Sequence, residues 1–102
     1  MSIDDDKLID LLEQKINQID LLTKSYQKDA LRQWKTEVSI ILDAVIGSET
    51  KYYKQFEQIH YAPITFFEDA TEADYNAANT NGLNEAKSIL QAIIFGKKNQ
   101  IF

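Results

Sequence analysis

The apolar residues of this chain recur every three or four positions, which is the spacing of one face of an α-helix. Near the N-terminus this stripe is formed by Leu8, Leu11, Leu12, Ile16, Ile19 and Leu22. No segment alternates apolar and polar residues as a half-buried strand would. The periodicity therefore predicts an all-α protein, and a length of 102 residues suits a single domain over residues 1–102 with one core.

Four helices are expected from these stripes, at residues 4–23, 25–46, 49–60 and 72–95. Gly47 ends the second of them, as glycine commonly does just beyond a helix. Packed side by side, they predict a domain that resembles a four-helix bundle. Its expected core consists of Leu12, Ile16, Ile19, Leu31, Trp34, Val38, Ile41, Phe56, Ile59, Leu83, Ala86, Ile89, Leu90 and Ile93.

Helix starts are indicated by small polar residues with an acidic partner three positions on. Ser2 with Asp5 is the expected N-cap of the first helix, and Ser48 starts the third. Thr71 with Asp74 predicts a capping box at the start of the fourth.

One long connection, residues 61–70, separates the third and fourth helices. Pro63 stops the third helix because a proline pushes the residue before it out of the helical region. The connection contains Ile64, Phe66 and Phe67, which make it too apolar for a purely solvated loop. We expect it to lie across a helix and pack there.

The fourth helix contains the pair Asn81-Gly82, which is a turn signal in many sequences. The apolar phase continues across this pair without a skip, so we expect one helix, with Gly82 where a neighbouring helix crosses closely. A break at Asn81 is the alternative. Gly96 is expected to cap the C-terminus, where Lys97 and Lys98 suit the negative end of the helix dipole.

Reactive groups are scarce, with one histidine, one arginine and no cysteine. His60 lacks a second histidine or cysteine with which to bind a metal, so capping or packing at the end of the third helix is expected. The carboxylates gather at two helix starts, where they offset the helix dipole: Asp4, Asp5 and Asp6, and Glu68, Asp69, Glu72 and Asp74. We therefore expect no catalytic residue, no cofactor and no metal, and the alternative is a loosely bound divalent cation.

The net charge of −5 argues against binding to nucleic acid or to an anionic membrane. The longest apolar stretches are about four residues, too short to span a membrane. The N-terminus lacks the basic and apolar regions of a signal peptide. The absence of cysteine fits a reducing compartment, and we expect a cytoplasmic protein.

Basic residues recur along the second helix at spacings of four, four and three: Lys24, Lys28, Arg32 and Lys35. They predict a cationic stripe beside the apolar face, which could follow phosphates or meet an acidic partner. A solvated helix flank would have the same pattern.

Aromatic residues crowd into residues 52–67, and most of them are expected to fill the core, with one or two at a partner or oligomer surface. The candidate interaction surface is formed by Tyr52, Tyr53, Tyr61, Phe66, Phe67, Lys28, Arg32 and Lys35. The terminal pair Ile101-Phe102 either folds back or contacts another chain.

A set of packing and capping residues matches a pattern seen elsewhere: Trp34-Lys-Thr-Glu37, Gly47-Ser48, Tyr53, Phe56, Ile59-His-Tyr61-Ala-Pro63, Gly82-Leu83, Ala86 and Leu90. The chain thereby resembles a small helical module found at the N-terminus of many predicted bacterial anti-phage and abortive-infection-type proteins, and alone in prophage hypothetical proteins. The resemblance implies a role in assembly or recognition ahead of an effector domain, and it assigns no functional residues. This sequence contains no effector domain.

These observations predict a non-catalytic protein–protein interaction or oligomerisation module, of phage or prophage type. Its partner would be another protein or a second copy, as in a homo-oligomer, with no nucleic acid and no membrane involved. The alternative is a small acidic phage-type regulator or inhibitor that docks on a basic site of a host protein.

Overall fold

The structure, a computed structural model, describes residues 4–63 and 70–102. Its helices are α1 (Asp5–Lys24), α2 (Lys28–Val45), α3 (Lys51–Glu57) and α4 (Glu72–Lys98). The described residues contain no strand, and the predicted all-α, bundle-like fold is confirmed. No helix in the described part of the chain has the length and apolarity needed to cross a membrane.

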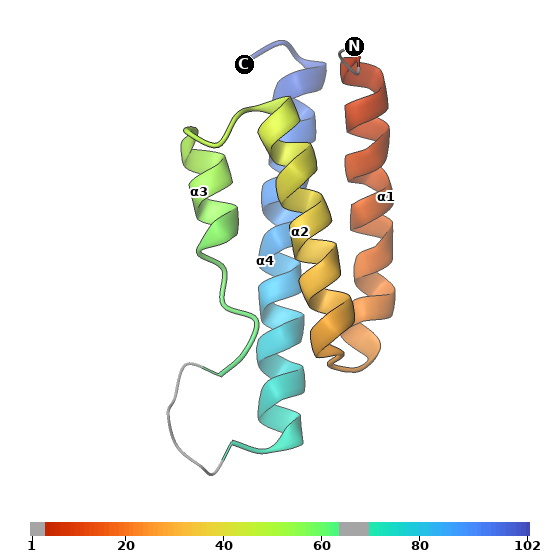
Figure 1. Cartoon of the computed structure of the whole chain (residues 1–102), viewed down its shortest axis with the longest axis vertical. Helices are drawn as coiled ribbons and strands as arrows, with labels where there is room; N and C mark the ends of the chain where they lie inside the picture. Colours follow the sequence, from red (N-terminus) through yellow and green to blue (C-terminus); the bar gives the residue numbers. More distant parts are fainter. Residues whose placement is uncertain (1–3, 64–69) are drawn as a thin grey trace.

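The four helices run alternately up and down, each beside the next in the chain (Figure 1). Helix α1 packs against α2 and α4, and α3 packs against the same two helices, so α1 and α3 occupy opposite corners. Helix α3 has only seven residues and fills one end of its corner. The chain after it, residues 58–63, continues along α4 toward the other end (Figure 1). We call residues 58–63 the strap.

The core is close to the one expected from the helical stripes. The prediction was wrong for Ile16 and Ile89. Both were expected in the core, but they are only partly buried and each lines a shallow surface depression. Six further apolar or aromatic residues are buried that the expected core omitted: Leu8, Ile9, Leu42, Val45, Tyr61 and Ile94. Most of these extend the same stripes by one turn, whereas Tyr61 comes from the strap.

The helix caps follow the expected chemistry, but two lie further along the chain than predicted. Asp4 caps α1, accepting a hydrogen bond from the backbone N–H three residues on at 2.8 Å, and Ser2 lies outside the described residues. Thr50, rather than Ser48, caps α3 in the same way at 3.3 Å. The capping box at the start of α4 is confirmed.

Helix α2 begins at Lys28, three residues later than residue 25. The backbone N–H of Tyr26 donates to Asn76 Oδ1 at 3.1 Å, and the Tyr26 ring lies 5.8 Å from the ring of Tyr75. These contacts fix the connection against α4, and they take Tyr26 out of the helix.

Helix α3 ends at Glu57, not at His60. Beyond it, Ile59 and Tyr61 are buried and His60 between them is exposed. This alternation is that of an extended chain laid on a surface, and it buries two side chains that a continued helix would place on different faces. The connection to α4 is non-helical throughout its described part, as predicted.

Helix α4 is continuous through Asn81 and Gly82, which excludes the alternative break. The close neighbour of Gly82 is the strap rather than the helix that was predicted. A Cβ atom at Gly82 would lie 2.6 Å from the His60 carbonyl oxygen and 2.8 Å from the Tyr61 ring. Glycine is therefore what allows the strap to lie flat on α4.

Gly96 does not cap α4, which continues to Lys98. Its missing side chain leaves room for the Phe102 ring, which folds back over Gly96 and lies 5.5 Å from the Tyr52 ring. Of the two outcomes expected for the terminal pair, the structure shows folding back for Phe102, while Ile101 stays exposed.

Candidate functional site

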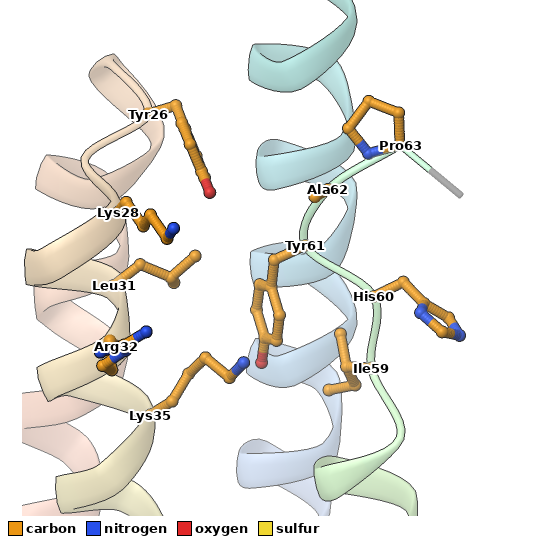
Figure 2. A pocket seen from close by; sticks show the side chains of 10 residues that line it. All are labelled: Tyr26, Lys28, Leu31, Arg32, Lys35, Ile59, His60, Tyr61, Ala62 and Pro63. Carbon is orange, nitrogen blue, oxygen red and sulfur yellow. The ribbon is translucent and has the colours of Figure 1, made fainter. Parts of the chain in front are cut away.

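A groove with a volume of about 400 Å³ lies between the N-terminal half of α2 and the strap (Figure 2). It exists because α3 is short, so that this part of α2 faces an extended segment instead of a helix. We call it the α2–strap groove. It is lined by Tyr26, Lys28, Leu31, Arg32, Lys35, Ile59, His60, Tyr61, Ala62 and Pro63.

One wall of the groove is cationic. Lys28, Arg32 and Lys35 follow one another on successive turns of α2, and all three line the groove. Lys28 and Arg32 are exposed, whereas Lys35 is half-buried with its ammonium 4.8 Å from the centre of the Tyr61 ring. At this distance the cation is attracted by the face of the ring.

The opposite wall is apolar and aromatic. Ile59 and Tyr61 of the strap are buried, and Ala62 and Pro63 continue the wall toward one end (Figure 2). His60 belongs to the same segment, but its imidazole is turned away from α2 (Figure 2). The groove is open and its lining is mixed, with cationic and polar side chains facing apolar and aromatic ones, as in the sites where proteins bind partners.

Tyr61 is 5% exposed, and its buried hydroxyl has no hydrogen-bond partner among the described residues. Figure 2 shows the ring between α2 and the strap, with the hydroxyl toward the end of the Lys35 side chain. Burial raises the pKa of this hydroxyl, and the charges of Glu85 and Glu57 raise it further. Tyr61 therefore remains a neutral hydrogen-bond donor.

The structure brings together some members of the predicted surface and separates others. Lys28, Arg32, Lys35 and Tyr61 meet in the α2–strap groove. The structure does not bring Tyr52 or Tyr53 to the groove: Tyr52 packs with Phe102 at the other end of α4, and Tyr53 packs half-buried against the core. Both are on α3, which ends before the groove begins. Phe66 and Phe67 lie outside the described residues.

Sequence reasoning missed Tyr26 and Pro63 as lining residues and misplaced His60 in a helix. The sequence signal for the strap was weak: Pro63 restricts only Ala62 directly, and the three residues Ile59, His60 and Tyr61 are too few to show the alternation of an extended segment.

The groove offers charge and hydrogen bonding rather than a metal site. No group of three or more histidine and carboxylate side chains is placed to hold a metal ion in residues 4–63 and 70–102. Of the two acidic clusters, Asp4–Asp6 is exposed at the start of α1, and Glu68 and Asp69 lie outside the described residues.

Comparisons of the chain with protein-family models, curated proteins and solved structures found no match.

Proposed function

We propose that the protein is a non-catalytic protein–protein interaction module that binds an acidic segment of a partner protein in the α2–strap groove. The observation that carries this proposal is the groove's cationic wall, formed by Lys28, Arg32 and Lys35 opposite an apolar and aromatic wall. A segment that combines carboxylates with an apolar or aromatic side chain would satisfy both walls at once.

The charge of the whole chain supports a short acidic segment over a long polyanion. The net charge is −5, so the groove is a local positive region on an otherwise acidic molecule. A nucleic acid that extended beyond the groove would meet repulsive surface. A peptide segment of groove length would not, and attraction would be confined to the groove.

A role in recognition also agrees with what the resemblance to modules of anti-phage and prophage proteins implies. The alternative, an acidic regulator that docks on a basic site of a host protein, would use the acidic surface and leave the groove unused. Charge reversal inside the groove separates the two, because only a groove-binding module depends on Lys28 and Arg32.

The test uses a fluorescently labelled random copolymer of glutamate and tyrosine as the probe and measures its anisotropy. We expect the wild-type protein to bind it, with an affinity that falls steeply as salt is added. The double variant Lys28→Glu with Arg32→Glu should lose binding.

The matched control is Lys7→Glu with Lys54→Glu, two exposed lysines outside the groove. Both double variants change the net charge equally, so the control should retain most of the binding. Equal loss in the two double variants would show that net charge alone governs the interaction, and it would overturn the groove as the site.

A second candidate function is self-association through the C-terminal end of α4. Phe95, Ile101 and Phe102 are 61%, 64% and 50% exposed, and they lie close together in the chain. Large apolar side chains gathered at one place on a surface mark contact sites more often than isolated ones do.

A further inference from the structure

The Tyr61 hydroxyl is an unexplained group in the α2–strap groove. It is buried and lacks a partner among the described residues, and a buried hydroxyl without a hydrogen bond destabilises a folded protein. A phenylalanine would fill the same space without this penalty. The ring alone therefore does not explain the tyrosine, whereas a ligand that accepts a hydrogen bond would.

Lys35 provides a charge at the same place. Its side chain is half-buried over the Tyr61 ring, and it makes no ion pair with any described residue. An ammonium can donate three hydrogen bonds, and its flexible stem allows it to move from the ring face toward an anion. The two side chains come from opposite walls and meet in the groove (Figure 2).

We propose that the ammonium of Lys35 and the hydroxyl of Tyr61 form a subsite for one carboxylate of the bound segment. This inference rests on the proposed function and specifies its ligand: an aspartate or glutamate side chain of the partner is held at this point of the groove. The carboxylate pairs with Lys35 and accepts the hydrogen bond from Tyr61, a charge-assisted arrangement.

Two carboxylates lie near this subsite and reduce its attraction for anions. Glu57 and Glu85 lie close enough to raise the pKa of the Tyr61 hydroxyl. The same two charges offset part of the attraction that the groove's cationic wall exerts on a bound anion, so the hydrogen bond from Tyr61 adds to the binding of the carboxylate. The hydroxyl, which burial keeps protonated, remains available as a donor over the whole range in which carboxylates are ionised.

Tyr61→Phe is the informative variant, because its effects on stability and on binding should differ in sign or size. With no hydrogen bond to lose, it should leave the urea midpoint unchanged or raise it. Binding of the glutamate–tyrosine copolymer should weaken by roughly tenfold, as expected for a lost hydrogen bond to a charged group. Tyr53→Phe, which removes a hydroxyl outside the groove, should change neither the midpoint nor the affinity.

Lys35→Met tests the second member of the subsite while retaining an apolar stem. It should weaken copolymer binding. The affinity of the double variant with Tyr61→Phe should fall by a smaller factor than the product of the two single-variant factors, because both groups hold one carboxylate.

The outcomes separate this inference from the proposed function. If the charge-reversed groove loses binding but Tyr61→Phe binds like the wild type, the subsite is overturned and the groove remains. A marked loss of stability in Tyr61→Phe would mean that the hydroxyl has a partner within the protein, which also overturns the subsite. If the wild type does not bind the copolymer, both proposals fail.

Discussion

At the scale of single residues, Gly82 decides whether the groove can exist. The strap forms one wall only because it lies directly on α4, and the contact passes over the bare backbone of this glycine. The nearest atom to an added Cβ is the His60 carbonyl oxygen at 2.6 Å, a backbone atom that can move only if the strap moves. A glycine inside a helix is unfavourable by about 1 kcal/mol relative to alanine, so the close contact outweighs helix propensity here.

Gly82→Ala should therefore lower the free energy of unfolding by about 1–3 kcal/mol, the usual cost of forcing extra volume into a packed site. The measurement is urea denaturation followed by circular dichroism. The displaced strap should also weaken copolymer binding. Asn84→Ala, an exposed position on the same helix, should be neutral or slightly stabilising. A Gly82→Ala protein as stable as the wild type would contradict the account of the strap.

At the scale of elements, a polar link joins α1 to α2 within an otherwise apolar contact. The Lys15 ammonium pairs with the Glu37 carboxylate, and the Lys15 side chain is only 12% exposed. The indole N–H of Trp34 donates to the Lys15 carbonyl oxygen at 3.0 Å beside it. These two bonds fix the register of the helix pair.

The Lys15–Glu37 link predicts a pH dependence. Hydrogen bonds from Lys15 and then from Gln33 hold the pKa of Glu37 below its usual value of 4.5. A carboxyl with a lower pKa in the folded state stabilises the protein above the unfolded pKa, and this contribution is lost as the pH falls through the folded pKa.

Glu37→Gln should accordingly be less stable than the wild type at pH 7, and the difference should shrink as the pH falls below 4.5. Urea midpoints at a series of pH values measure it. Glu49→Gln, at an exposed carboxylate with no ion pair to a described residue, is the control and should follow the wild type. A difference that persists unchanged into acid would show that the charge of Glu37 plays no part.

The helices and most core positions could be predicted from the sequence because periodicity is a local property. Trp34, Val38 and Leu90 face inward as their spacing requires. The predicted helix boundaries were wrong where a contact with a residue distant in the chain determines them. The start of α2 depends on the bond from Tyr26 to Asn76, fifty positions away in the chain, and no local signal reports that bond.

Only the cationic wall of the candidate site could be predicted, again because helical periodicity is a local property. Lys28, Arg32 and Lys35 lie on one helix, so their spacing alone placed them on one face. Lys24, the fourth member of the predicted stripe, instead ends α1 and does not line the groove. The opposite wall depends on where α3 ends and on which surface the strap then covers. Tyr61 was expected in an interaction surface, but its position beside Lys35 follows from the packing of the strap on Gly82.

At the scale of the whole molecule, one helix of the bundle is much shorter than the other three. Helices α1, α2 and α4 have 18 to 27 residues, whereas α3 has seven. A longer α3 would pack along α2 and close the space that the groove occupies. The short helix therefore exposes part of α2, and that part carries the cationic stripe. The space left by the short helix and the cationic stripe therefore lie at the same place on a molecule with a net negative charge.

The exposed apolar residues at the C-terminal end of α4 predict concentration-dependent self-association, because burying Phe95 and Ile101 between two copies would remove apolar area from water. Light scattering coupled to size-exclusion chromatography should give a mass that rises from 11.7 kDa toward twice that value with concentration. Phe95→Gln should restore the monomer without affecting copolymer binding. Leu21→Gln, which removes a similarly exposed residue near the C-terminal end of α1, should leave the mass unchanged. A monomer at every concentration would exclude this interface.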